Sequence, residues 1–290
     1  MTSGKALRDG MAEKGLVHIM ATHSPISALL AEEAGFDGLW ASGFELSALY
    51  GLPDMSLVTM TQHLEMLRCI VGRSSLPVVA DIDTGFGNAL NVIHAVREYE
   101  RAGVAAVVIE DKTFPKVTSL AAAGRQELAR PEEFQGKIEA AVATRRDPDF
   151  LVIARTEALI AGQGEAEALR RAAAYEEAGA DMILIHSKSK TPDEVESFVR
   201  AWGGRVPIAV VPTAYPEMNA PRIRALKKIG MVIYGNHAIR AAVTAMQDVF
   251  AAIIADQGIH SVQDRIVSVE EIFRLQGMDA AKADEARFLR

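Results

Sequence analysis

Carboxylate side chains stand at the ends of two neighbouring apolar runs of this sequence, where their type and spacing could bind a cation. Asp81 and Asp83 close the run PVVADID, and Glu110 stands near the end of the next run, AAVVIED. Residues two apart on a β-strand point to the same side, so Asp81 and Asp83 are expected to converge. Several carboxylates gathered without a cation raise one another's pKa steeply. A divalent ion removes that cost, and ligands that are all oxygen favour Mg²⁺ or Mn²⁺ over zinc.

Polar residues also follow most of the other apolar runs. An acid between a strand and a helix commonly caps that helix, so the capping and metal-binding interpretations of the carboxylates both stay open. The further polar residues at run ends are Ser42, Gly43, Arg155, His186, Thr213, Asn236 and His237. Active sites of parallel β/α folds lie at the carboxyl ends of the strands, so we expect these residues to share one site. A lone histidine at a strand end, such as His186, is as often a hydrogen-bonded structural residue as a residue of the active site.

The longest irregular connection, residues 111–130, follows the run that contains Glu110. Connections of this length inside a compact domain are usually functional lids or disordered segments. Its anion-binding side chains are Lys112, Lys116, Thr118, Ser119 and Arg125. We therefore expect a lid over an acidic floor, and the alternative is a solvated loop whose charges are incidental.

Eight short apolar runs alternate with longer amphipathic segments along the chain and must position these polar residues. Each run is too short for a lone helix and too continuously apolar for a strand with one solvent-exposed face. Such runs are typical of a parallel sheet that is buried on both faces. The intervening helices are expected to end at Gly35, Gly103, Gly179 and Gly230, because glycine supplies the left-handed residue after a helix. Eight such units predict a (β/α)8 barrel, with a doubly wound sheet as the alternative.

Composition excludes several classes of protein. The 290 residues are 49% apolar and 24% charged, as in ordinary globular proteins. A net charge of −7 argues against a nucleic-acid partner, which would call for a basic patch. The single cysteine, Cys69, excludes an intramolecular disulfide framework and a cysteine-based zinc finger.

No targeting segment or domain boundary is evident along the chain. We expect no membrane partner, because no apolar run approaches the roughly 20 residues that cross a bilayer. The N-terminus lacks the apolar core of a signal peptide, which predicts a cytoplasmic protein. No linker divides the chain, so we expect one barrel domain over residues 1–290, with a helical extension over about 258–290.

Three long strings carry a family resemblance. They are WASGFELSALYGLPD from Trp40, ADIDTGFGNALNV from Ala80 and EDKTFPKVTSL from Glu110. Together they closely resemble the phosphoenolpyruvate mutase and isocitrate lyase superfamily, and the match runs along nearly the whole chain. The further strings GRQELAR, ARTEALIAG, VPTAYP and VIYGNHAIRAAV are most similar to the branch of that superfamily that hydrolyses phosphonopyruvate.

The resemblance implies an architecture, a metal and a set of site residues. The barrel would be a modified (β/α)8 barrel whose last helix is exchanged between subunits, giving a homo-oligomer that is a dimer of dimers. Asp81 matches the direct ligand of Mg²⁺, for which Mn²⁺ or Co²⁺ could substitute, whereas Asp54, Asp83 and Glu110 match residues that reach the ion largely through waters. The positions that match substrate-binding residues are Ser42, Gly43, Phe44, Ser119, Arg155 and His186, and Lys116 matches the lysine of the mobile loop.

At two positions this sequence differs from some members of the superfamily, and these differences indicate which of the superfamily's activities to expect. The carbon–carbon lyases carry a Lys-Lys-Cys-Gly-His loop with a catalytic cysteine, where this chain reads Lys-Thr-Phe-Pro-Lys. The mutase carries asparagine at the position of Thr118, and threonine there is the hydrolase pattern. The resemblance therefore implies hydrolysis of the P–C bond of 3-phosphonopyruvate to pyruvate and phosphate, through a Mg²⁺-stabilised pyruvate enolate. The expected catalytic residues are Asp54, Lys116, Thr118, Arg155 and His186.

Several alternatives stay open. The nearest is the mutase reaction, which interconverts phosphonopyruvate and phosphoenolpyruvate. A second is a decarboxylase or lyase acting on another 2-oxo acid through the same enolate chemistry, and a third is a metal-free binding protein on the same barrel. Within the hydrolase hypothesis, the nucleophile is either a water positioned by Thr118 or the Thr118 hydroxyl itself.

Overall fold

The computed structural model describes residues 2–121 and 126–290 of the chain. Arg125, one of the anion-binding residues expected in the long connection, lies outside the described residues. The described chain divides into two compact units, Met1–His237 and Ala238–Arg290.

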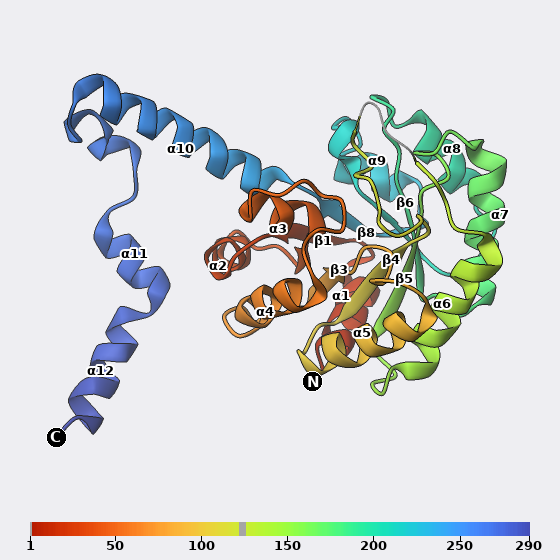
Figure 1. The fold of residues 1–290 in the computed structure, drawn as a ribbon, viewed down its shortest axis with the longest axis horizontal. Helices are drawn as coiled ribbons and strands as arrows, with labels where there is room; N and C mark the ends of the chain where they lie inside the picture. The colour runs from red at the N-terminus through yellow and green to blue at the C-terminus, as the bar shows by residue number, and fades with distance from the viewer. Residues whose placement is uncertain (1, 122–125) are drawn as a thin grey trace. The chain divides into compact units, whose positions relative to one another are not determined.

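Eight parallel strands close into a barrel in chain order. Figure 1 shows strands at the centre of the first unit with helices around them. The strands are β1 (Val17–Thr22), β2 (Gly38–Ala41), β3 (Val78–Asp81), β4 (Ala106–Glu110), β5 (Leu151–Thr156), β6 (Met182–Ile185), β7 (Ile208–Val210) and β8 (Ile229–Tyr234). Strand β8 pairs with β1, with Ile233 opposite Ile19, and this pairing closes the ring. The predicted (β/α)8 barrel is confirmed, and closure excludes the doubly wound sheet, which would leave two edge strands.

One helix precedes the first strand, and the other helices follow strands around the outside of the barrel (Figure 1). They are α1 (Ser3–Lys14), α2 (Pro25–Glu33), α3 (Gly43–Leu49), α4 (Met60–Val71), α5 (Ala89–Arg101), α6 (Pro131–Thr144), α7 (Gly164–Glu177), α8 (Asp193–Ala201), the 3₁₀ turn η1 (Pro212–Ala214) and α9 (Ala220–Ala225). Side-chain caps define several of their starts. Thr59 and Gln62, for example, form a reciprocal capping box at the beginning of α4.

Alternate residues of each strand supply two apolar cores. In β4, Ala106 and Val108 face the cluster inside the barrel, whereas Val107 and Ile109 face the cluster under the helices. Leu7 of α1 joins the inner cluster. Strands with both faces buried must be apolar at every position, which is why the eight runs could be recognised in the sequence.

Three of the four predicted helix stops are confirmed. Gly35, Gly103 and Gly179 have φ angles of 84°, 87° and 97°, the left-handed values that end a helix and that suit glycine. The prediction for Gly230 is wrong, because this residue lies inside β8. The turn after α9 is instead made by Lys227, a non-glycine residue with φ 60°.

The second unit contains most of α10 (His237–Asp256), the 3₁₀ turn η2 (His260–Arg265), α11 (Val269–Gln276) and α12 (Met278–Phe288). It begins about twenty residues before the predicted extension, because α10 itself belongs to it. The expectation that no apolar segment approaches membrane-spanning length is wrong for α10, a 20-residue helix that contains an 18-residue stretch with a mean hydropathy of 1.5. Arg240 and Asp248 interrupt its apolar sequence, and one such helix is weak evidence for a membrane span. The single-domain assignment stays a prediction.

Candidate active site

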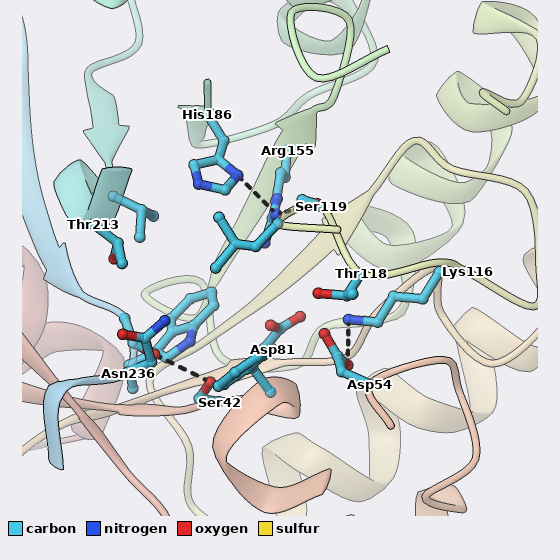
Figure 2. A pocket seen from close by; sticks show the side chains of 15 residues that line it. Ser42, Asp54, Asp81, Lys116, Thr118, Ser119, Arg155, His186, Thr213 and Asn236 are labelled. Carbon is cyan, nitrogen blue, oxygen red and sulfur yellow. Dashed lines mark hydrogen bonds and ion pairs between the residues drawn. The ribbon is translucent and has the colours of Figure 1, made fainter. Parts of the chain in front are cut away.

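A pocket opens at the carboxyl ends of the barrel strands and gathers residues from elements far apart in the sequence. It is lined by Trp40, Ser42, Phe44, Asp54, Asp81, Lys116, Thr118, Ser119, Leu120, Arg155, His186, Val211, Thr213, Gly235 and Asn236. Nine of the twelve predicted site residues are among them. The other three, Gly43, Asp83 and Glu110, do not line the pocket but lie beside residues that do, as described below. In Figure 2, Asp54 and Lys116 lie on one side of the pocket, and Arg155 and His186 lie on another.

Asp83 reaches this site by a route that the sequence argument did not foresee. Strand β3 ends at Asp81, so the expectation that Asp81 and Asp83 lie on one strand and point to the same side of it is wrong. Asp83 instead adopts a left-handed conformation with φ 51°, which is costly for a residue other than glycine. Its carbonyl accepts the N–H of Glu110 at 2.8 Å, and its own N–H donates to Asp81 Oδ1 at 3.2 Å. These bonds from β3 and β4 hold the strained residue in place.

The ammonium of Lys116 lies between two of the predicted metal-site carboxylates. Its Nζ is 2.9 Å from Asp54 Oδ1 and 2.7 Å from Asp83 Oδ1, and the side chain is almost entirely buried. Burial alone would lower the pKa of Lys116, but the charges of Asp83 and Asp54 outweigh it and hold the pKa well above its usual value. Lys116 therefore stays cationic and neutralises part of the acidic cluster.

Burial has the opposite effect on the carboxylates. It raises the pKa of Asp83 to about 7, although the charge of Lys116 opposes the rise. Burial also raises the pKa of Asp81, where Lys116 and Arg155 act in the opposite direction and the carboxylate of Glu110 adds to the rise. Neighbouring carboxylates thus add to the raised pKa values near the ends of β3 and β4, as expected for acids gathered without a cation.

The donor set fits a hard cation that keeps part of its water shell. Among residues 2–121 and 126–290, no three His, Cys, Asp or Glu side chains are grouped closely enough to hold a metal ion directly. Glu110 Oε1 is nevertheless buried and accepts no hydrogen bond from the described residues. Mg²⁺ typically takes one or two carboxylates and retains several waters, so a looser set of carboxylates suits it. The assignment of Asp81, Asp83, Glu110 and Asp54 to a metal site stays a prediction.

Gly43 lets the backbone of the Ser42 segment approach these acids. A Cβ at Gly43 would lie 2.9 Å from Asp83 Oδ1 and 3.6 Å from Asp81 Oδ2, closer to the first than real Cβ contacts allow. Ser42 caps α3, its Oγ accepting the N–H of Glu45 at 3.2 Å. The start of α3 therefore lies directly against the acidic cluster.

The opposite side of the pocket is cationic and is built on β5 and β6. Arg155 Nη2 is 3.1 Å from Ser119 Oγ and 3.2 Å from His186 Nδ1 (Figure 2). A guanidinium can only donate, so neutral His186 accepts through Nδ1 and carries its proton on Nε2. Burial lowers the pKa of His186, which favours this neutral form. His186 Nε2 is buried and bonds to no described residue, which leaves it available as a donor.

Two buried residues behind the pocket differ from the sequence analysis. Lys112, expected to offer its ammonium to an anion, is only 2% exposed and lies 3.1 Å from Glu157 Oε2. Glu157 was not singled out, although it lies two residues after Arg155 in the string ARTEALIAG. The only signal in the sequence was an acidic residue two positions after Arg155, directly after the apolar run FLVIART. Trp40, Leu120 and Val211 also line the pocket without having been predicted.

Comparisons with known proteins show the family to which the chain belongs. The family model described as phosphoenolpyruvate phosphomutase matches residues 7–254. The chain is 59% identical over 290 residues to a phosphonopyruvate hydrolase of Variovorax sp. (strain Pal2), covering 100% of both chains. It is 44% identical over 283 residues to a phosphoenolpyruvate phosphomutase of Tetrahymena pyriformis, covering 98% of this chain and 94% of the relative.

Solved structures of the same two kinds of enzyme superpose closely on this chain. The crystal structure of a phosphonopyruvate hydrolase in complex with oxalate and Mg²⁺ superposes with a TM-score of 0.95 at 57% identity, covering 100% of both chains. A phosphoenolpyruvate phosphomutase from Streptomyces platensis subsp. rosaceus gives a TM-score of 0.96 at 49% identity over 99% of each chain. The chain therefore belongs to the phosphoenolpyruvate phosphomutase family.

Proposed function

We propose that this protein hydrolyses the P–C bond of 3-phosphonopyruvate to give pyruvate and phosphate. The observation that carries the proposal is the position of Thr118 in the pocket, between the acidic side that holds Lys116 and the cationic side that holds Arg155 (Figure 2). The 59% identity to a phosphonopyruvate hydrolase over the whole chain supports it.

Mg²⁺ is the proposed cofactor, since a relative of 57% identity was crystallised with Mg²⁺ and oxalate. Asp81 would bind it directly, and Asp54, Asp83 and Glu110 would bind it largely through waters. When bound, the ion supplies positive charge beside the carboxylate and carbonyl oxygens of the substrate, where negative charge accumulates as the P–C bond breaks.

The cationic side of the pocket is suited to the phosphonyl group. Arg155 and His186 Nε2–H offer donors to its oxygens, and Ser119 Oγ lies 3.1 Å from Arg155. Phosphoryl transfer usually passes through a loose transition state whose charge is spread over the equatorial oxygens. Donors held in place before the reaction stabilise that charge without reorganising.

Thr118 and Lys116 act at the reacting bond. An oxygen nucleophile, either a water oriented by the Thr118 hydroxyl or that hydroxyl itself, attacks phosphorus as the P–C electron pair moves to carbon. Attack by water gives phosphate directly, whereas attack by the hydroxyl gives a phosphothreonine that a water must then hydrolyse to release phosphate and restore Thr118. The pyruvate enolate formed in this way takes up a proton to become pyruvate. The Lys116 ammonium, held by Asp54 at 2.9 Å, places a fixed positive charge beside this exchange.

Product analysis tests the proposal directly. Purified protein is incubated with Mg²⁺ and phosphonopyruvate, and pyruvate and phosphate are assayed together while phosphorus NMR follows the products. Equal amounts of pyruvate and phosphate are expected, whereas phosphoenolpyruvate as the product would show the mutase reaction instead. Turnover of oxaloacetate in place of phosphonopyruvate would indicate a decarboxylase or lyase. Chelation followed by addition of Mg²⁺, Mn²⁺ or Co²⁺ identifies the ions that support turnover.

The second unit supports a proposal about assembly. Large apolar side chains such as Phe250 in α10, Val269 in α11 and Phe288 in α12 are each more than 60% exposed within the chain. Exposed apolar surface of this kind usually marks an interface. We propose that it is covered in a homo-oligomer, a dimer of dimers in which the last helix is exchanged. Light scattering is expected to give the mass of four chains. Cytoplasmic location stays a prediction.

A further inference from the structure

Glu157 is a fully buried carboxylate immediately behind the cationic side of the pocket. It follows β5 and does not line the pocket itself. A buried carboxylate is retained only where cations and hydrogen bonds compensate its lost hydration. The partners of Glu157 therefore indicate what the residue does.

Those partners come from three separate parts of the chain. Arg155 Nε, in β5, donates to Glu157 Oε1 at 2.6 Å, and His186 Nδ1, directly after β6, lies 3.7 Å from the same oxygen. From the connection after β4, Lys112 Nζ lies 3.1 Å from Glu157 Oε2, and the Ser119 hydroxyl donates to that oxygen as well. Glu157 Oε1 thus contacts the two residues on the cationic side of the pocket. Glu157 Oε2 contacts the connection after β4, which carries Thr118.

Further bonds make this arrangement specific. Lys112 Nζ also donates to Ser119 Oγ at 2.6 Å and to the carbonyl of Val117 at 2.8 Å, on either side of Thr118. Burial alone would raise the pKa of Glu157, but the charges of Arg155 and Lys112 hold it well below its usual value. Glu157 is therefore ionised at neutral pH and serves as the counter-ion for both cations.

The geometry fixes the orientation of the Arg155 guanidinium. With Nε bonded to Glu157, the plane of the guanidinium is set and Nη2 is directed at Ser119 and His186. Without this bond, Arg155 and Lys112 would be two neighbouring cations without their shared counter-ion. Both the direction of the phosphonyl-binding donors and the position of residues 117–119 would then change.

We propose that Glu157 is a positioning residue that aligns Arg155 and His186 with the Thr118 segment by holding both through its two carboxylate oxygens. It touches neither substrate nor metal in this scheme. The inference rests on the proposed function for its kinetic consequences, but the linkage between Glu157, Arg155 and His186 is a property of the protein without substrate. The two can therefore be tested separately.

Two substitutions separate the position of the carboxylate from its charge. Glu157→Gln keeps the shape and removes the charge, and Glu157→Asp keeps the charge but is one methylene shorter. Displacing a binding group by about 1 Å can cost on the order of 10²-fold in rate. We expect kcat/KM for phosphonopyruvate to fall on the order of 10²-fold in Glu157→Gln, with kcat carrying most of the loss. Glu157→Asp is expected to lose at least about tenfold, because its carboxylate cannot reach both sides.

Glu196→Gln is the matched control. Glu196 is buried in α8, outside the pocket, and its carboxylate pairs with two arginines, Arg200 at 2.6 Å and Arg222. Glu196→Gln removes the charge of a carboxylate that also pairs with two cations, but does so without touching the site, so kcat/KM is expected to stay within about twofold of wild type. Melting temperatures measured for all variants show whether each one is folded.

The titration of the His186 imidazole, followed by NMR without substrate, reports on the linkage directly. The groups that face His186 are Glu157, Arg155 and Lys112. Because the Glu157 carboxylate raises the pKa of His186, that pKa is expected to fall in Glu157→Gln and to stay unchanged in Glu196→Gln. His186→Asn assigns the signal among the seven histidines.

The outcomes are distinct. An unchanged His186 titration in Glu157→Gln would overturn the positioning role, as would wild-type kcat/KM in both Glu157 variants. Wild-type kinetics in Glu157→Asp alone would show that charge suffices and would also overturn it. If the wild-type protein does not hydrolyse phosphonopyruvate, the proposed function fails, and the His186 titration still decides the role of Glu157.

Discussion

Acid is expected to destabilise this protein through His63, a histidine buried in α4 next to the barrel. Its Nδ1 lies 2.7 Å from the Tyr99 hydroxyl of α5, and the residue is 4% exposed. Burial lowers the pKa of His63 from its ordinary value of 6.5 to about 4, because the charged imidazolium would lose its hydration. The folded state therefore holds His63 neutral at a pH where the unfolded chain binds a proton.

The direction and size of the effect follow from linkage. A group whose pKa is lowered on folding contributes stability above its unfolded pKa, and this stability is lost as the pH falls toward the folded pKa. Here the window runs from pH 6.5 down to about pH 4. A pKa difference of this size costs about 3 kcal/mol over the whole window, of which about 2 kcal/mol falls between pH 7 and pH 5.

Urea unfolding of wild type and His63→Gln at pH 7, 6 and 5 measures this cost. Glutamine can accept the Tyr99 hydrogen bond but does not titrate, so the gap in unfolding free energy between the two proteins should narrow by about 2 kcal/mol from pH 7 to pH 5. His94→Gln is the control, since His94 is exposed on α5. The reasoning is refuted if the stability curves of wild type and His63→Gln stay parallel from pH 7 to pH 5.

Three further predictions concern the site. Thr118→Ala is expected to lower kcat on the order of 10²-fold or more, while Thr118→Ser retains most activity, and near-normal turnover in the alanine variant would remove Thr118 from the mechanism. In Asp81→Ala, the rise in melting temperature that Mg²⁺ produces in wild type is expected to disappear; an equal rise in both proteins would place the ion elsewhere. Gly43→Ala is expected to raise KM at least about tenfold, because its Cβ would lie 2.9 Å from Asp83 Oδ1. An unchanged KM would show that the start of α3 can shift away.

The barrel could be predicted from sequence because its strands are buried on both faces. In a strand such as β4, Val107 faces the helices and Val108 faces the barrel interior. No side chain of such a strand faces water, so every position favours an apolar residue. The result is a continuous apolar run that differs clearly from the amphipathic helices around it. Gly230 shows the limit of such reasoning, since a glycine can be used inside a strand as well as after a helix.

The general location of the site could also be predicted from sequence. Polar residues at the ends of parallel strands meet at one end of a barrel, whatever the details of packing. Ser42, Asp81, Arg155 and His186 therefore line one pocket although they lie far apart in the chain. The roles assigned to individual loop residues depended on the family resemblance.

What the sequence by itself determined is thus the order of strands and helices and the end of the barrel that carries the chemistry, because both depend on local patterns of apolar and polar residues. Only the tertiary structure decided that Asp83 turns into the site with a left-handed backbone and that Lys112 points inward to Glu157. The physical reason is that a charged side chain is buried or exposed according to the partners that compensate its lost hydration. Those partners come from other elements of the fold, and no local pattern encodes them.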